Sequence, residues 1–218
     1  MSANCCGSSN FDKGAEQLTS RYRKILWVAL IVNGGMFLVE IFAGLAAGSA
    51  SLQADALDFL GDAGNYGISL FVFGMALRVR AKAALFKGMV MALFGFWVIG
   101  ATISHAVSGT LPGAITMGVV GSAAFVANAV VFILLWSYRA GDSNMRSVWL
   151  CTRNDVLGNI AVLIAAAGVV GTGTGWPDFI VAAVMAFLAL QGAWVVIRQA
   201  LGEINEEDER RPLPSSLN

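Results

Sequence analysis

Charged side chains are scarce in this sequence of 218 residues, of which Asp, Glu, Lys and Arg make up only 13% and hydrophobic residues 57%. A soluble globular domain typically has about 25% charged residues. The composition therefore excludes an ordinary soluble domain and predicts an integral membrane protein, as does the mean hydropathy of +0.70. The net charge of +0 indicates no particular partner, and we expect a lipid bilayer but no nucleic acid.

Cysteine, proline and histidine are also rare. The three cysteines are Cys5, Cys6 and Cys151, and an odd number with two neighbours does not fit a disulfide framework. There are 4 Pro but 25 Gly, and glycine is common in membrane helices because it lets backbones approach closely. The first 20 residues are polar and lack the apolar segment of a signal peptide, so we expect none.

Apolar segments of membrane-spanning length follow one another along the chain and predict an all-α membrane protein with six transmembrane helices. The expected helices are residues 25–47, 51–77, 88–108, 114–136, 147–170 and 178–201. They form a transmembrane domain, residues 25–201, between an N-terminal tail, residues 1–24, and a short charged tail, residues 202–218, which we expect to be disordered. A basic loop is expected between the second and third helices; it contains Arg78, Arg80, Lys82 and Lys87.

Lysine and arginine alternate between the two sides of the predicted bundle. The N-terminal tail, the second and fourth loops and the end of the last helix contain them, whereas the first, third and fifth turns contain none. By the positive-inside rule, both the N and the C terminus are expected to be cytoplasmic. The small size and the lack of a targeting segment suit a bacterial inner membrane.

Three aspartates, Asp55, Asp58 and Asp62, interrupt the second expected helix. At about 100° per residue they share one narrow face. An ionised carboxylate at mid-membrane costs roughly 2.5–3.5 kcal/mol on insertion scales, so such groups usually face a bundle interior or wet cavity and bind something positive.

The fifth expected helix carries a similar pair, because Cys151 and Asp155 are four residues apart. The second and fifth helices run in opposite directions, and in a core about 30 Å thick the two pairs come near the same level. Asp58, Asp62, Cys151 and Asp155 could therefore supply four ligands, which suits a tetrahedral divalent ion.

These residues resemble the cation diffusion facilitator family of zinc, cadmium and manganese efflux transporters. The segment G-S-A-S-L-Q-A-D-A-L-D-F-L-G-D-A is similar to the family's helix 2 signature, and Asp58 and Asp62 match its metal ligands. L-C-T-R-N-D-V-L-G-N resembles the helix 5 signature, with Asp155 at the aspartate and Cys151 where histidine is usual. The resemblance covers about residues 26–201 and implies a transporter, not an enzyme, whose metal is cargo and which has no prosthetic group.

Two features depart from the family pattern. The thiolate of Cys151 is softer than imidazole and should favour Zn²⁺ or Cd²⁺ over Mn²⁺ or Mg²⁺. Family members usually carry a cytoplasmic domain after helix 6, whereas only residues 202–218 follow here, so the chain is expected to be a short form. A homodimer is left open.

The charge of the predicted site suggests a mechanism. Three carboxylates and a thiolate would carry four negative charges, and so dense a cluster cannot stay fully ionised when empty. Protons should occupy the empty site and metal should displace them, which is the physics of metal/proton antiport, here in the direction of efflux.

For several other residues the sequence leaves two possible roles open. Asp55 is either a group that supports the site near the outer mouth or a capping, solvated residue, and Glu40 is either a proton relay or a partner in a helix–helix hydrogen bond. Arg153 either lies away from the site face, where it pairs with another helix or extends its charge to the membrane surface, or it balances the negative charge of the site. Cys5 and Cys6 either capture soft metal from the cytoplasm or are incidental.

The competing class is a membrane-embedded, metal-dependent enzyme, because acid clusters in membrane helices also hold Mg²⁺ for phosphotransfer or perform aspartyl proteolysis. The sequence lacks the Asp-Gly dipeptide that such a phosphotransferase would need. A passive channel would leave the paired spacings unexplained. One further acid, Asp178, follows Pro177 and is expected in the first turn of the last helix.

Overall fold

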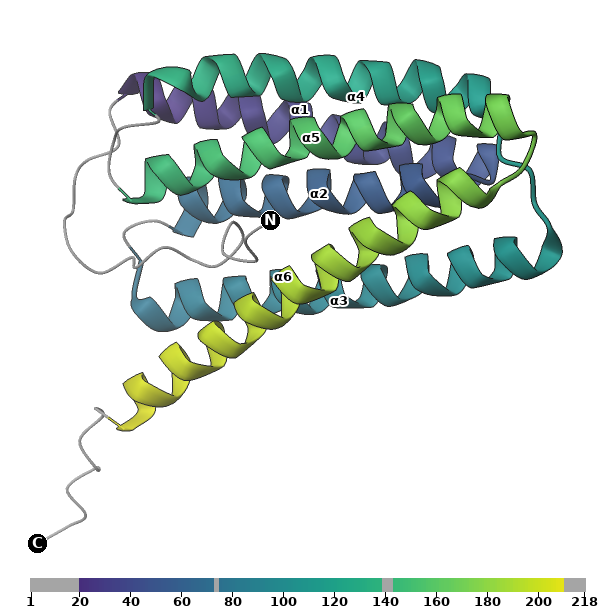
Figure 1. Cartoon of the computed structure of the whole chain (residues 1–218). Coiled ribbons are helices and arrows are strands. Elements are labelled where there is room, and N and C mark those ends of the chain that lie inside the picture. The colour runs from purple at the N-terminus through teal and green to yellow at the C-terminus, as the bar shows by residue number, and fades with distance from the viewer. Residues whose placement is uncertain (1–19, 73–74, 139–142, 210–218) are drawn as a thin grey trace, which may run out of the picture.

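The described part of the chain is helical apart from its turns, and no strand occurs in it. The structure is a computed structural model that describes residues 20–72, 75–138 and 143–209 (Figure 1). Its elements are α1 (Ser20–Ala47), α2 (Ala50–Gly67), the π-helix η1 (Ile68–Val72), α3 (Leu77–Ser108), α4 (Ala114–Leu135), the 3-10 helix η2 (Trp136–Tyr138), α5 (Ser143–Thr172) and α6 (Trp176–Glu209). The predicted all-α fold is confirmed.

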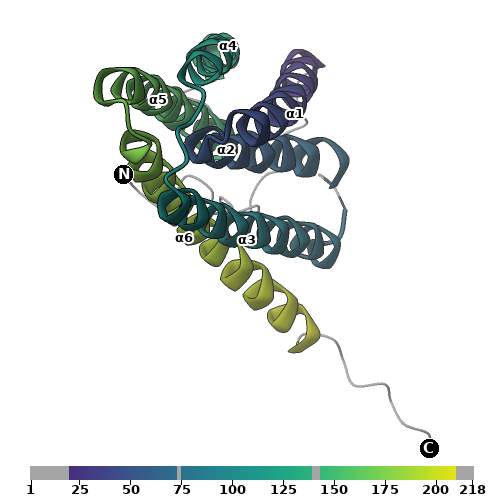
Figure 2. The ribbon, with the colours of Figure 1, turned by 90° about the vertical axis from the view of Figure 1, so that its right-hand side faces the viewer.

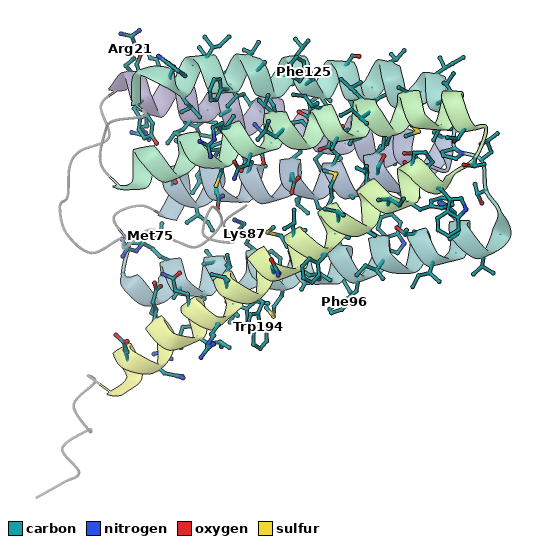
Figure 3. The ribbon with its side chains drawn as sticks, in the orientation of Figure 1. Arg21, Met75, Lys87, Phe96, Phe125 and Trp194 are labelled. Carbon is teal, nitrogen blue, oxygen red and sulfur yellow. The ribbon has the colours of Figure 1, made fainter. Side chains whose placement is uncertain are left out.

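Five of these helices, α1, α3, α4, α5 and α6, are long and apolar enough to cross a membrane. Large apolar side chains cover their outward faces; Phe96 of α3 and Trp194 of α6, for example, are both 65% exposed and point away from the bundle (Figure 3). Apolar surface of this extent is stable in contact with lipid tails rather than with water. The protein is therefore an integral, multi-pass membrane protein.

The least apolar of the long helices, α2, occupies the centre of the molecule. It packs against α1, α3, α5 and α6, and the end-on view shows it between the other helices (Figure 2). Because α2 carries three aspartates, its composition alone does not identify it as a membrane-spanning helix. Because protein surrounds α2, its acids are kept away from lipid.

The helices divide into two groups. α1, α2, α4 and α5 lie side by side, whereas α3 packs chiefly against α6, which runs obliquely across the other helices (Figure 1). Two buried apolar clusters fill the interior. One includes Leu52 and Leu57 near the start of α2, and the other includes Tyr66 near its end. Asp58 and Asp62 lie between them along the helix.

The predicted turns are present and have clear local causes. After α1 the chain reverses through Gly48, whose φ of +61° is a left-handed conformation that glycine adopts without strain. Ser49 then caps α2, because its Oγ accepts a 3.2 Å hydrogen bond from the Leu52 N–H. Gly109, with φ of +65°, ends α3 in the same way.

The helix boundaries differ from the sequence-based ones by four residues or more at five helix ends. α1 begins at Ser20 rather than at residue 25, and α5 begins at Ser143 rather than at residue 147. The expected basic loop is wrong: Arg78, Arg80, Lys82 and Lys87 all lie within α3, which begins at Leu77. Arginine, lysine and alanine are good helix formers, and their long stems can cover apolar surface while the charge reaches polar surroundings. The second helix ends at Gly67 and continues as η1 rather than as an α-helix to Leu77. α6 extends to Glu209, so the expectation of a disordered tail is wrong for residues 202–209, which continue the helix.

Candidate metal centre

Asp62 of α2 and Asp155 of α5 are brought together where these two helices meet. Asp62 is 4% exposed and Asp155 is half-buried, and the two carboxyl groups are within hydrogen-bonding reach of each other. Two carboxylates this close repel each other unless a proton or a metal cation lies between them. A positive ion at the α2–α5 interface would therefore relieve the repulsion between these two carboxyl groups.

Tyr66 and Thr152 extend this contact by one turn. The Tyr66 hydroxyl donates a 2.8 Å hydrogen bond to Oδ2 of Asp62, and Oγ1 of Thr152 lies 3.1 Å from the same hydroxyl oxygen. Since the phenol has a single proton, which goes to Asp62, the Thr152 hydroxyl is the donor in the second bond. All three side chains are buried, so the chain from Thr152 to Asp62 orients the carboxylate in the interior.

Asp58 lies one turn before Asp62 on α2 and is half-buried. Gly158 of α5 faces it: a Cβ atom on this glycine would lie 3.7 Å from Oδ2 of Asp58 and 3.7 Å from Oδ1 of Asp55. It would also lie 3.4 Å from Cε of Met185. The absence of a side chain at Gly158 lets the α5 backbone approach the acidic face of α2.

Asp55 is fully buried, so the solvated, capping reading of this residue is wrong. Nδ2 of Asn159 on α5 donates a 2.6 Å hydrogen bond to its Oδ2, and Nδ2 of Asn128 on α4 donates a 2.9 Å bond to Oδ1 of Asn159. This chain of amides joins α4, α5 and α2. Glu40 of α1 is equally buried and its carboxyl group faces Asp55, with Asp58 as a further acidic neighbour.

Cys151 is buried one turn before Asp155 on α5. However, the four expected ligands do not converge on one point. Among the residues that the structure describes, no three His, Cys, Asp or Glu side chains are grouped closely enough to hold a metal ion. The structure thus pairs Asp62 with Asp155, and neither Asp58 nor Cys151 completes a group of three with that pair.

Lys87 is a feature that sequence reasoning missed, because it was placed in a loop. It lies on α3 on the side towards α2 (Figure 3) and is 8% exposed. Its Nζ donates a hydrogen bond to Oδ1 of Asn65, its stem packs against Gly64, and its charge attracts Asp62. A cation of the protein itself therefore offsets part of the negative charge of the site.

The remaining candidates are Arg153, Cys5 and Cys6. Arg153 is exposed and donates a 3.4 Å hydrogen bond to Oδ1 of its neighbour Asn154. The role of Arg153 stays a prediction. Cys5 and Cys6 lie outside the described residues.

Asp178 lies in the first turn of α6, as predicted, but its main contact is with α2. Its carboxylate accepts hydrogen bonds from the hydroxyls of Ser49 and Ser51, at 2.7 and 2.5 Å, and from the backbone N–H groups of Ala50 and Ser51, at 2.7 and 3.0 Å. The first N–H groups of a helix have no partner within it. Asp178 satisfies two of them and fixes the start of α2 to α6.

Two of the missed residues could have been found from spacing. The i,i+4 step that relates Cys151 to Asp155 also reaches Asn159, and the step from Asp58 to Asp62 also reaches Tyr66. Extending each pair by one turn on the same helix face would have added both residues. The partners on other helices, Thr152 and Lys87, carry no comparable signal.

The sequence is similar to a known family of membrane domains and to several known transporters. The profile of the cation efflux transmembrane domain matches residues 26–204. The chain is 25% identical over 203 residues to a cadmium, cobalt and zinc/H(+)-K(+) antiporter of Bacillus velezensis, a match that covers 84% of this chain and 63% of that protein. It is also 26% identical over 196 residues to the zinc transporter ZitB of Pectobacterium atrosepticum, covering 84% of this chain and 61% of that protein.

A third relative is the metal cation efflux system protein CzcD of Cupriavidus metallidurans, 22% identical over 193 residues, or 83% of this chain and 61% of that protein. The chain thus spans less than two thirds of the length of these relatives. All three are named as transport proteins rather than as membrane enzymes. Because the profile match covers most of its length, including α2, α3, α4, α5 and most of α1 and α6, the chain belongs to the cation efflux family.

Proposed function

We propose that this protein exports divalent metal cations of the Zn²⁺ and Cd²⁺ type in exchange for protons. The contact between the carboxyl groups of Asp62 on α2 and Asp155 on α5 is the observation that carries the proposal. It unites the two helices on which the i,i+4 pairs lie, deep inside a membrane protein of the cation efflux family. The relatives that are named as zinc or cadmium transporters support the same class of cargo.

The proposed ligands are Asp58, Asp62, Cys151 and Asp155. The carboxyl groups of Asp62 and Asp155 are within hydrogen-bonding reach of each other, and Asp58 and Cys151 are each one turn away on the same two helices. A change of rotamer combined with a small shift between α2 and α5 would bring all four to one ion. Three oxygen atoms and one sulfur atom suit a tetrahedral ion of intermediate softness, such as Zn²⁺ or Cd²⁺.

Exchange for protons follows from the charge of this set. Lys87 offsets only one of the negative charges that fully ionised ligands would carry, and the Tyr66 hydroxyl contributes a neutral hydrogen bond. Ligands must lose their protons to bind a metal, so metal entry releases protons and proton entry releases metal. A proton gradient across the membrane can then drive the metal in the opposite direction.

We place α2 as a sixth crossing and both ends of the chain on the cytoplasmic side. α2 runs through the bundle alongside helices of spanning length (Figure 1). Arg21, at the start of α1, lies at the same end of the bundle as Met75, just before α3 and its basic residues (Figure 3). The positive-inside rule assigns that end to the cytoplasm. Because the relatives are bacterial, we assign the protein to a bacterial inner membrane.

The test is zinc flux into proteoliposomes that contain a zinc-sensitive dye, measured with and without a pH gradient. We expect wild-type flux to rise with the gradient, and Asp155→Asn and Asp62→Asn to abolish both flux and zinc binding. Glu206→Gln is the matched control, because it removes an exposed acid at the end of α6. Flux at the wild-type rate from Asp155→Asn would refute the proposed site.

A further inference from the structure

Glu40 of α1 and Asp55 of α2 are two carboxyl groups in the bundle interior that face each other, and the proposed metal site uses neither of them. Both side chains are 0% exposed. The two carboxyl groups are close neighbours, and the negative charge of Asp55 acts on Glu40. Asp55 and Asp62 are separated by seven residues, or about 10 Å along the helix axis. The Glu40–Asp55 pair is therefore distinct from the Asp62–Asp155 pair.

Three of the four oxygen atoms of this pair have no hydrogen-bond donor in the part of the chain that the structure describes. They are both carboxyl oxygens of Glu40 and Oδ1 of Asp55. The fourth, Oδ2 of Asp55, accepts from Asn159, which Asn128 holds in place. Buried carboxyl oxygens are normally satisfied by a donor or a cation, so this arrangement needs a positive partner.

The helices around Glu40 do not provide that partner. α1 packs against α2, α4 and η1, and its Phe37 also makes a ring contact with Phe94 of α3, around which residues 90–98 contain no ionisable side chain. α2 directs only acids, Asp55 and Asp58, towards Glu40, and neither α4 nor η1 contains an ionisable residue. The buried ammonium group of Lys87 is engaged with Asn65 and Asp62. A pair of buried carboxyl groups without a positive charge is strongly destabilising.

We propose that Glu40 and Asp55 form a second cation site, which holds one small hard cation, a proton or an alkali ion, between oxygen atoms alone. Its role as an additional site for an exchanged ion, beside the protons held by the metal ligands, rests on the antiport proposed above. The donor set fits this class of ligand: it contains no sulfur or imidazole, and carboxylate oxygens prefer hard cations to the softer Zn²⁺ and Cd²⁺.

The hydrogen-bonded amides of Asn128 and Asn159, which hold Asp55, also link this site to the proposed metal site. Asn159, which holds Asp55, lies one turn after Asp155 on α5, and Asp55 shares α2 with Asp58 and Asp62. A shift of α5 relative to α2 that changes the ligands around the metal must also change the contact between Asn159 and Asp55. Occupancy of the two sites is therefore coupled through the two helices that both sites use.

The experiment compares wild type, Glu40→Gln and Asp55→Asn, with Asn33→Ala as the matched control. Asn33 is buried on the same helix as Glu40, but its amide donates a 2.8 Å hydrogen bond to the carbonyl of Ala29 within α1. Zinc flux in proteoliposomes is driven in three ways: by a pH gradient with N-methylglucamine as the only other cation, by a K⁺ gradient and by a Na⁺ gradient. Zinc binding in detergent is measured in parallel.

We expect one gradient to accelerate wild-type flux and thereby to identify the cation. In Glu40→Gln and Asp55→Asn that acceleration should fall by about tenfold or more. Zinc affinity should change by much less, because both variants keep all four proposed zinc ligands. Asn33→Ala should behave as wild type. Acceleration in both Glu40→Gln and Asp55→Asn that equals that of wild type would overturn the second site.

Infrared difference spectra of wild type against Glu40→Gln test the site without transport. A bound proton gives the carbonyl band of a neutral carboxyl group, and a bound alkali ion shifts the carboxylate bands when K⁺ or Na⁺ is added. A wild-type spectrum with neither signal would overturn the proposal even if zinc is carried. If Asp155→Asn retains zinc binding while Glu40→Gln loses its infrared signal, the metal site is refuted and the second site stands.

Discussion

The hydroxyl group of Tyr66 donates a 2.8 Å hydrogen bond to Oδ2 of Asp62, one turn away on α2. Thr152 of α5 lies 3.1 Å from the same hydroxyl oxygen, so α5 meets Asp62 both through Asp155 and through Tyr66. Tyr66 also belongs to the buried apolar cluster at this end of α2. Its ring is fixed by packing, and its hydroxyl group fixes the direction of the carboxylate that we propose as a ligand.

Tyr66→Phe is the first prediction, because it keeps the packed ring and removes one hydroxyl group. A hydrogen bond to a charged acceptor is worth about 1.5–3 kcal/mol, so we expect zinc binding to weaken by about tenfold or more. Calorimetric titration of the purified protein with zinc measures this. Thr152→Val is the control, since it leaves the bond between Tyr66 and Asp62 intact and should cost less affinity. Equal affinities for wild type and Tyr66→Phe would show that the hydroxyl does not position Asp62.

The parts of the fold that sequence reasoning predicted correctly depend on local spacing. The turn at Gly48 follows from a short run of small residues, and the contact between Asp62 and Asp155 agrees with two i,i+4 motifs on antiparallel helices. Both signals are contained in a few neighbouring residues, and helix geometry converts them directly into positions.

The parts that could not be predicted depend on partners far apart in the chain. The sequence around Lys87 reads as a basic loop, and only the packing of α3 against α2 shows that this lysine is buried beside Asn65. Asp178 is a plausible first-turn acid of α6, but its bonds to Ser49 and Ser51 join residues more than 120 positions apart. No local pattern contains such a pairing.

Asp178→Ala should destabilise the protein, which is the second prediction. The substitution leaves the N–H groups of Ala50 and Ser51 without an acceptor at the buried start of α2, and it removes the bond that joins α2 to α6. Loss of a helix cap with unsatisfied donors is worth about 3 kcal/mol of unfolding free energy. Thermal unfolding in detergent should therefore show a lower midpoint.

Two further variants serve as comparisons for Asp178→Ala. Asp178→Asn keeps one acceptor oxygen and should fall between wild type and Asp178→Ala. Ser122→Ala removes an exposed hydroxyl group whose 2.6 Å bond goes to the carbonyl of Gly118 in its own helix, and it should unfold as wild type does. An unchanged midpoint for Asp178→Ala would mean that other contacts hold the start of α2.

Gly158 gives the third prediction, because two substitutions at this position should differ. A single Cβ atom would lie 3.4 Å from Met185 and 3.7 Å from the oxygens of Asp55 and Asp58, which are ordinary contacts. Gly158→Ala should fold well and gain about 1 kcal/mol of helix propensity. The extra methyl groups of Gly158→Val should displace the acids and reduce zinc flux sharply. Equal flux from the two variants would show that α5 does not approach the acids closely during transport.

Cys151→His is the last prediction and concerns the choice of metal. Imidazole binds zinc well but is harder than thiolate, so we expect zinc flux to persist and the preference for Cd²⁺ over Zn²⁺ to fall severalfold. Competition between the two ions in one proteoliposome assay measures this ratio directly. Cys151→Ser is the matched control: it keeps the size of the side chain, removes the sulfur and should weaken binding of both ions, Cd²⁺ more than Zn²⁺. A Cd²⁺ preference that survives both substitutions would show that the buried thiol of Cys151 does not touch the metal.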